Sequence, residues 1–338
     1  MINIVYRLKY PKFFEESIDN IELDGVVVRP TYLSICKADQ RYYQGSRPPE
    51  VLSQKLPMAL IHEAVGEVVH DSNSVFDSGD KVVMIPNTPM ARDCYRANYS
   101  TLSKFRGSGF DGFSSDLVSL NHDRVVKLPD NFDLKVSAFI ELMTVAYQGI
   151  MKFKEFNKSS CDVLGVWGDG NMGYITALFL KEIFPHSEIV VFGKHMENLN
   201  LFSFADKVYM INDIPEGFKI DHGFECVGSA ASQSAIEQII NLINPQGTIN
   251  LFGVSEYPIP INTRMVLEKG LTLQGNSRSE REDFEGVVSI LQNNPNLFDY
   301  LSKLITNICE IKSIDDLKKS FDRDYISDFG KTILKWEI

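Results

Sequence analysis

The sequence predicts an α/β protein of two domains, and three observations support this prediction. A chain of 338 residues, of which 44% are hydrophobic, is long enough to form two domain-sized cores. The first third contains short β-type runs separated by turn residues, which is typical of a compact strand-rich domain. From about Phe139, apolar strands alternate with longer helical stretches, and this alternation predicts a parallel, doubly wound sheet.

The strand-rich domain is predicted from three runs of apolar and β-branched residues, at 25–36 (GVVVRPTYLSIC), 63–70 (EAVGEVVH) and 80–87 (DKVVMIPN). After Asn276, a helical stretch (REDFEGVVSILQNN) and a mixed tail ending in GKTILKWEI leave the alternation of strands and helices. We expect this tail to return to the first domain. Residues 1–141 and 277–338 would then form one domain, and residues 142–276 the doubly wound one.

The doubly wound domain is predicted from apolar segments that alternate in type. Its strands are predicted at CDVLGVWG, EIVVFG, DHGFECVG, GTINLFGV and LTLQGN, and its helices at NMGYITALFLKEIF and SAIEQIINLI.

A glycine-rich turn, residues 168–173 (GDGNMG), joins the first of these strands to the following helix. This G-x-G-x-x-G pattern stands in the strand–turn–helix context that dinucleotide binding requires. Gly168 permits the tight turn, Gly170 lets a pyrophosphate approach the backbone, and Gly173 allows the helix to pack closely on the strand. A structural turn in another α/β protein is the alternative. The cofactor-binding residues predicted here are Gly168, Gly170, Asn171, Met172 and Gly173.

The next strand, EIVVFG, ends about 20 residues beyond the glycines, where an NAD enzyme places Asp or Glu to bind the ribose 2′-hydroxyl. Here the sequence has Gly193, Lys194 and His195. With no carboxylate in this slot and a cation beside it, the sequence favours NADPH over NADH. We therefore add these three residues to the predicted cofactor site. The alternative is that Lys194 is a solvated surface residue.

The charge and the cysteines exclude several classes of protein. A net charge of −11 argues against binding to duplex nucleic acid or to an anionic membrane surface. The N-terminus, MINIVYRLKY, lacks a signal-peptide core, and no run approaches the roughly 18 apolar residues of a spanning helix. Five scattered cysteines are typical of a reducing compartment. We expect a cytoplasmic protein without membrane insertion.

Four residues are candidate metal ligands. Cys36 ends one strand, the adjacent His62 and Glu63 open the next clear strand, and Glu141 precedes the doubly wound domain. Thiolate, imidazole and carboxylate are all good Zn²⁺ ligands, and a catalytic zinc leaves one position open for water or substrate. Taken singly, these residues could also be a buried thiol, a surface pair and a carboxylate at a helix start.

Several segments resemble, in order, the signatures of zinc-dependent medium-chain dehydrogenases. Residues 36–39 (CKAD), 61–68 (IHEAVGEV) and 79–82 (GDKV) are similar to C-x-x-D, G-H-E-x-x-G-x-V and G-D-x-V, and FECVG follows the glycine turn at a family-like position. The resemblance covers nearly the whole chain and implies a GroES-like catalytic domain beside a Rossmann domain. It also implies one catalytic zinc per chain. The implied metal ligands are Cys36, His62, Glu63 and Glu141, and the implied catalytic residues are Glu63 and Asp39.

Longer stretches resemble the ribulose-5-phosphate reductases that supply ribitol phosphate for teichoic-acid or capsule synthesis. They include SICKADQRYYQGSRPPEVLSQKLPMALIHEAVGEVV, GFDGFSSDLVSLNHDRVV and VSEYPIPINTRMVLEKGLTLQGNSRS. This resemblance implies that NADPH reduces a zinc-bound ketose carbonyl to give ribitol 5-phosphate. It further implies a homo-oligomer, dimer or tetramer, and functional coupling to a cytidylyltransferase. Because Arg binds phosphate in a bidentate manner, the candidates for the substrate phosphate are Arg41, Arg47, Arg106 and Arg278.

The chain departs from the family pattern in three places. The four-cysteine lobe that binds a structural zinc in many members has only Cys94 here, so no structural zinc is expected. Ala38 has no hydroxyl where alcohol dehydrogenases often use Ser or Thr to relay a proton. Arg41 stands where a His is common, which adds a cation near the expected active site.

Two other functions remain open. One is an NAD(P)-linked polyol or alcohol dehydrogenase that acts on an unphosphorylated substrate. A test for a phosphate requirement in the substrate would distinguish it from the ribulose-5-phosphate reductase. The other is a non-catalytic nucleotide-binding protein, since a fold does not fix a function. Zinc analysis would separate this second alternative.

Overall fold

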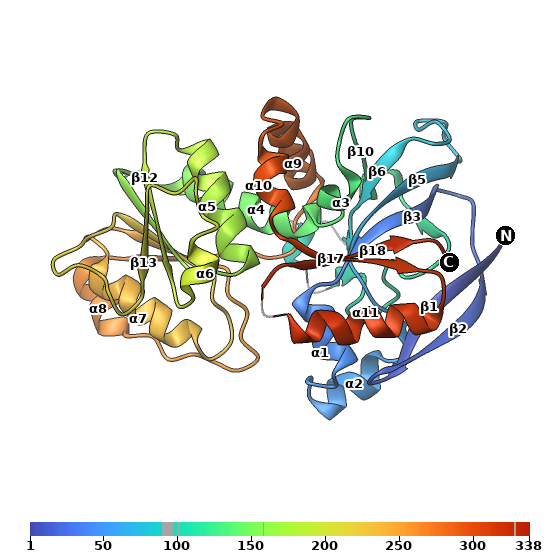
Figure 1. Ribbon diagram of the computed structural model, residues 1–338, viewed down its shortest axis with the longest axis horizontal. Coiled ribbons are helices and arrows are strands. Elements are labelled where there is room, and N and C mark those ends of the chain that lie inside the picture. The colour runs from blue at the N-terminus through green and yellow to red at the C-terminus, as the bar shows by residue number, and fades with distance from the viewer. Residues whose placement is uncertain (90–96, 101, 158, 328) are drawn as a thin grey trace. The chain divides into compact units, whose positions relative to one another are not determined.

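The computed structural model describes residues 1–89, 97–100, 102–157, 159–327 and 329–338, and the chain divides into two compact units. Unit 1 comprises Met1–Thr144 and Arg278–Ile338, and unit 2 comprises Val145–Ser277. Figure 1 shows the chain coloured by residue number and labels many of its helices and strands. Cys94, the remnant of the cysteine lobe, lies outside the described residues.

Unit 1 consists mainly of strands. Its strands are β1 (Ile2–Tyr10), β2 (Phe13–Asn20), β3 (Val26–Ser34), β4 (Met58–Ala59), β5 (Glu63–Asp71), β6 (Lys81–Met84), β7 (Asn87–Thr88), β8 (Lys104–Phe105), β9 (Val118–Leu120), β10 (Val125–Lys127), β17 (Ile305–Ile311) and β18 (Lys331–Trp336). Its helices are α1 (Lys37–Tyr43), α2 (Pro49–Lys55), α3 (Leu134–Ser137), α9 (Arg281–Asn293), α10 (Leu297–Ser302) and α11 (Ile314–Ile326), with short 3₁₀ turns at Ala97–Tyr99 and His122–Arg124. The domain boundary falls within α4 (Ile140–Phe156).

The largest sheet of unit 1 brings distant parts of the chain together. Its strand order, within the described residues, is β10-β6-β5-β3-β18-β17, and β9 also pairs with β3. Both β5 and β18 are antiparallel to β3, with Glu63 and Ile333 on either side of Ser34. The end of β3 therefore lies beside the start of β5 and the start of β18. Apolar side chains from these strands and from α11, such as Leu33, Phe321 and Leu334, pack into one core.

Unit 2 is the doubly wound part of the chain. Its strands are β11 (Val163–Trp167), β12 (Glu188–Gly193), β13 (Lys207–Met210), β14 (His222–Glu225), β15 (Thr248–Leu251) and β16 (Thr272–Gly275), and its helices are α5 (Asn171–Ile183), α6 (Met196–Leu199), α7 (Ser232–Leu242) and α8 (Thr263–Lys269). The strands pair in parallel in the order β13-β12-β11-β14-β15-β16. This is the 3-2-1-4-5-6 order of dinucleotide-binding sheets, and it confirms the predicted fold class.

Several elements of the fold were not predicted, among them helices α1, α2, α4 and α11, the β1–β2 hairpin and strand β13. The hairpin of β1 and β2 turns at Pro11 and Lys12, where Lys12 has φ = 64°. Short hairpins usually signal such a left-handed position with Gly or Asn, so this turn gives no sequence signal. Strand β13 is a short edge strand whose residues are partly exposed, and it lacks the continuous apolar run of its neighbours.

Candidate active site

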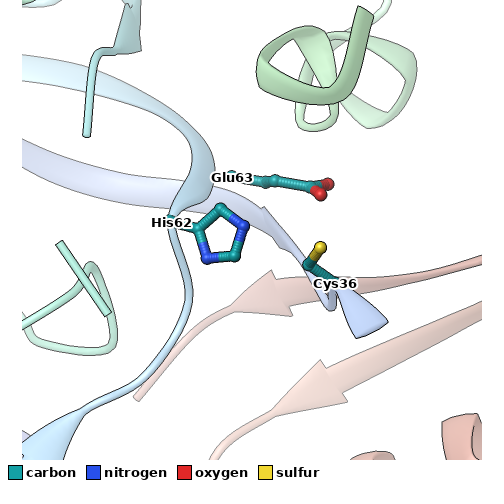
Figure 2. Close-up of side chains that lie close together, drawn as sticks. All are labelled: Cys36, His62 and Glu63. Carbon is teal, nitrogen blue, oxygen red and sulfur yellow. The ribbon is translucent and has the colours of Figure 1, made fainter. Parts of the chain in front are cut away.

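Three possible metal ligands lie together in unit 1. Cys36 follows β3 and caps α1, while His62 and Glu63 lead into β5. One ligand atom from each residue lies within 4.8 Å of the other two, and Figure 2 shows the three side chains gathered at one place. The register of β3 and β5 explains this, because Ser34 pairs with Glu63 and brings the segment after β3 to the start of β5.

The carboxylate of Asp39 fixes the backbone around these ligands. It is fully buried, and its two oxygens accept hydrogen bonds from the amides of Ile61 and Cys36, each at 3.0 Å. One oxygen also lies 3.4 Å from Nδ1 of His62. Ile61 has φ = 71°, a left-handed conformation that is uncommon for a β-branched residue. Asp39 thus holds the segments that present the thiol and the imidazole.

Lys331 is a member of the site that the sequence analysis did not identify. Its Nζ lies 2.7 Å from Oε2 of the fully buried Glu63 and donates to the carbonyl of Ile35 at 2.9 Å. Burial disfavours the charged ammonium, but Glu63 and Cys36 raise the pKa of Lys331 above its ordinary value. The available signal was a lysine at the start of a mostly buried strand pattern, KTILKW, since a buried lysine almost always has a partner.

Glu141 lies at the start of α4 and is also buried. Burial raises the pKa of its carboxyl to about 7, because nearby His62 and Lys331 only partly offset the burial and the negative charge of Glu63. Glu141 does not belong to the described group of ligand atoms within 4.8 Å of one another. The structure therefore places it in the same charged surroundings as the other three residues, without joining that group.

The properties of these residues fit a zinc ion. Burial disfavours a proton on His62, but Asp39 and Cys36 raise its pKa well above the ordinary value, and the same negative surroundings favour a metal cation. Oε1 of Glu63 is buried without a hydrogen-bond partner, which a cation would satisfy. A thiolate, an imidazole and a carboxylate are the ligand types that zinc takes in catalytic sites.

Unit 2 contains a cavity of about 180 Å³ at the carboxyl ends of its central strands. In open parallel sheets this is the place where nucleotides bind. The predicted residues Gly168, Gly170, Gly193 and Lys194 all line it. The remaining lining residues are Trp167, Asp169, Phe192, Ile211, Cys226, Val227, Ala231, Ser234, Ala235 and Gln238.

The glycine turn has the geometry that its sequence predicts. Gly168 has φ = 127°, which only glycine adopts readily. A β-carbon at Gly173 would lie 1.8 Å from the carbonyl oxygen of Gly168, whereas one at Gly170 would meet no atom within 4 Å. Helix α5 begins with Asn171 and Met172. The turn therefore leaves open space at Gly170, in front of the helix N-terminus, where backbone amides can bind a phosphate.

The end of β12 corrects one expectation. No carboxylate was expected near the ribose slot, but one oxygen of Asp169 accepts hydrogen bonds from the amides of Lys194 (2.8 Å) and His195 (2.6 Å). The same oxygen lies 3.0 Å from Nδ1 of His195. Asp169 comes from the glycine turn and not from the strand end, so a search at the strand end misses it. The two amides and the imidazole offset the negative charge of Asp169. The side chain of Lys194 is exposed to solvent.

The four arginines predicted for the substrate phosphate are all in unit 1 but differ in their surroundings. Arg41 lies in α1. Arg106 donates to the carbonyls of Asp111 and Ser119, and Arg278 donates to the carbonyl of Ser100, so both are engaged with the backbone. The guanidinium carbon of Arg47 lies 4.9 Å from the centre of the Tyr42 ring.

Comparisons with known proteins identify the family of the chain. Residues 22–130 match the alcohol dehydrogenase GroES-like domain, and residues 194–293 match the zinc-binding dehydrogenase domain. Ribulose-5-phosphate reductase 1 of Staphylococcus aureus (strain NCTC 8325 / PS 47) is 53% identical, over 99% of both chains. Ribulose-5-phosphate reductase of Bacillus spizizenii (strain ATCC 23059 / NRRL B-14472 / W23) is 48% identical, over the whole of both chains.

Solved structures also include similar proteins. The crystal structure of S. aureus TarJ in complex with NADPH has a TM-score of 0.91 and 50% identity, and the match covers the whole of both chains. L-idonate 5-dehydrogenase of Escherichia coli, at 21% identity and a TM-score of 0.85, shares the fold over 99% of this chain and 98% of its own. Among the described residues, no helix is long and apolar enough to cross a membrane.

Proposed function

The chain belongs to the zinc-binding alcohol dehydrogenase family, and we propose that it is an NADPH-dependent ribulose-5-phosphate reductase. The observation that supports this most strongly is the 53% identity over nearly the full length with a protein of that name. The similarity to a TarJ structure in complex with NADPH supports the choice of cofactor. The grouping of Cys36, His62 and Glu63, which could hold a metal ion, and the reductase relatives support an enzyme over a non-catalytic protein.

The reaction transfers a hydride from NADPH to C2 of ribulose 5-phosphate and adds one proton to the carbonyl oxygen, which yields ribitol 5-phosphate and NADP⁺. Zinc, when bound, would supply a Lewis acid for this carbonyl oxygen. Cys36 and His62 would hold the metal, with Glu63 and Glu141 as carboxylate ligands or exchanging neighbours. The residues that line the cavity of unit 2 would bind NADPH, with the pyrophosphate facing Gly170.

The charges around Glu63 define its part in the reaction. Its carboxylate is buried and pairs with Lys331, so it contributes a fixed negative charge beside the metal ligands. Asp39 keeps Cys36 and Ile61 in place and therefore positions the ligands. Ala38 offers no hydroxyl for a proton relay. We therefore assign the proton to an ordered water that Glu63 can orient.

Several finer points belong to the same proposal. The chain would bind one catalytic zinc and no structural zinc, because the cysteine lobe for a second metal is missing. It would be a cytoplasmic homo-oligomer, dimer or tetramer, as the scattered cysteines and the family resemblance suggest. Its product, a sugar alcohol phosphate, is a suitable substrate for a cytidylyltransferase, with which it would be functionally coupled.

A labelling experiment tests the proposed reaction. The zinc-loaded protein is incubated with ribulose 5-phosphate and with NADPH that carries deuterium at the transferred position. We expect equimolar consumption of both substrates and a ribitol 5-phosphate that contains one deuterium at C2, detected by mass spectrometry. NADPH consumption without a labelled pentitol phosphate, or no consumption at all, would contradict the proposal.

A further inference from the structure

The loop of Gly107 and Ser108 packs against His62 and also contacts the cation of Lys55. Gly107 lies so close to the metal group that a β-carbon there would be 3.6 Å from Nδ1 of His62. The next residue is Ser108, whose hydroxyl accepts a hydrogen bond from Nζ of Lys55 at 3.2 Å. Lys55 is the last residue of α2 and donates to the hydroxyl of Tyr42 at 3.1 Å.

The buried ring of Tyr42 holds the two cations near each other. Nζ of Lys55 lies 5.8 Å from the ring centre, and the guanidinium carbon of Arg47 lies 4.9 Å from it. Both distances are within the range of cation–π contacts. In a chain with a net charge of −11, such a local pair of cations is suited to attract an anion.

Lys55 differs from the structural lysines of the chain in its partners. Buried Lys331 has a carboxylate and a backbone carbonyl, and Lys269 donates to the carbonyls of Ile240 and Ile243. Lys55 contacts only two neutral hydroxyls, and no carboxylate of the described residues lies within ion-pair distance of it. An ammonium has three N–H donors, so one remains for a further acceptor.

The hydroxyls can also donate to an anion. The hydroxyl oxygens of Tyr42 and Ser108 both accept hydrogen bonds from Lys55 and lie 3.4 Å apart. At most one of the two hydroxyl protons can form a hydrogen bond between them. The other proton is left for a third acceptor. The site can thus offer a guanidinium, an ammonium and a hydroxyl, which are the donors that bind phosphate well.

The loop that carries Ser108 is held firmly. Arg106 donates to the carbonyls of Asp111 and Ser119, and the Asp111 carboxylate accepts from the amide of Ala59 at 2.8 Å. The amide of Phe113 donates to the carbonyl of Ile61. Arg106 therefore stabilises the loop internally, while Asp111 and Phe113 hold it against the segment before His62. This is a different task from binding the phosphate itself.

We propose that Lys55, Arg47 and Ser108 form the binding site for the phosphate of the substrate, with Tyr42 supporting the two cations. The proposal rests on the proposed function and names the residues that distinguish a phosphorylated ketose from a free one. The carbonyl carbon and the phosphorus of ribulose 5-phosphate are five bonds, or about 6 Å, apart. Tyr42 lies six positions after Cys36, about 9 Å along the axis of α1. The ketose covers this span once a metal–oxygen contact of about 2 Å at one end and a hydrogen bond of about 2.8 Å at the other are added.

The test compares Lys55→Met and Ser108→Ala with wild type, using ribulose 5-phosphate and unphosphorylated ribulose as substrates. Lys55→Met should lower kcat/KM for ribulose 5-phosphate about ten- to a hundredfold, mainly through KM, because one charged hydrogen bond is lost. Ser108→Ala should have a smaller effect of the same kind. Turnover of ribulose and the KM for NADPH should stay unchanged. Lys319→Met, which removes an exposed lysine of α11, is the matched control.

Inorganic phosphate provides a second measurement. It should inhibit ribulose reduction by the wild type in competition with ribulose, and Lys55→Met should weaken this inhibition about tenfold or more. An equal loss for both sugars, or an altered KM for NADPH, would overturn the phosphate site. A wild type that reduces both sugars equally well would instead overturn the proposed function, and the inhibition by inorganic phosphate would still decide whether Lys55 binds an anion.

Discussion

The buried ion pair of Glu63 and Lys331 shows how single residues maintain the active site. Both side chains are almost completely removed from water, so each charge depends on the other. Separating such a pair leaves an uncompensated charge in the interior, whereas removing both partners costs much less. The pair also joins β5 to β18, and so connects the metal group to the C-terminal strand.

Lys331→Met is therefore expected to destabilise unit 1 by about 3–5 kcal/mol, measured as the free energy of unfolding in urea on metal-free protein. The double variant Glu63→Met, Lys331→Met should recover most of this loss. Lys335→Met on the same strand is the control, because its partly exposed ion pairs contribute only about 0–1 kcal/mol. A single variant as stable as the wild type would show that the pair does not support the fold.

Cofactor choice is also a matter of single residues. Lys194→Ala should raise the KM for NADPH about ten- to a hundredfold and change that for NADH little, because only NADPH has the ribose 2′-phosphate that this ammonium would bind. Lys207→Ala, on the neighbouring strand β13, is the control. Gly193→Asp, which would place the carboxylate of an NAD enzyme at this strand end, is a poor test of cofactor choice. A β-carbon at Gly193 would lie 2.7 Å from Cβ of Asp169, so the substitution would disturb the local structure. An unchanged ratio of the two cofactors in Lys194→Ala would refute the assignment of Lys194.

At the scale of elements, the β11–turn–α5 unit determines where the pyrophosphate binds. The turn is built so that Gly168 and Gly173 serve the packing of helix on strand, while the space at Gly170 is left for the ligand. The two kinds of glycine should therefore respond differently to the same substitution.

Gly173→Ala should lower the unfolding midpoint and the affinity for NADPH, because its β-carbon cannot be accommodated 1.8 Å from the oxygen of Gly168. Gly170→Ala should keep the wild-type midpoint and lose affinity only, because its β-carbon would occupy the space of the pyrophosphate. Thermal unfolding and fluorescence titration with NADPH measure the two effects. Equal midpoints for the two variants would contradict this division of roles.

Local patterns predicted five of the six strands in the sheet of unit 2, and long-range pairing explains two site residues that they missed. The glycine turn, β11, α5 and β12 follow from apolar periodicity and turn residues alone. Cys36, His62 and Glu63 were found from short motifs, because each lies next to a strand end. Lys331 was missed since only the pairing of β18 with β3 brings it to Glu63. Asp169 was missed because its side chain bonds to the end of another strand.

At the scale of the whole molecule, the two chemical tasks belong to different units. The grouped metal ligands and the proposed phosphate site belong to unit 1, and every residue that lines the nucleotide cavity belongs to unit 2. Substitutions in the metal group should therefore abolish catalysis and leave nucleotide binding intact.

Cys36→Ser and His62→Ala should abolish turnover and zinc binding, and leave the affinity for NADPH largely intact. Cys309→Ser, which changes a free cysteine of β17, should retain both activity and zinc. Metal analysis of the wild type should give one zinc per chain, because the described part of the chain contains one group of candidate ligands. Two zinc ions per chain, or an equal loss of NADPH binding in the two variants, would contradict this separation.

The central claim is that this enzyme reduces a phosphorylated ketose with NADPH. The most direct measurement is kcat/KM of the zinc-loaded protein for the four combinations of ribulose 5-phosphate or ribulose with NADPH or NADH. We expect the pair of ribulose 5-phosphate and NADPH to exceed each of the others by at least about tenfold, the effect of one charged hydrogen bond. Equal or faster turnover of unphosphorylated ribulose, or a preference for NADH, would contradict the account.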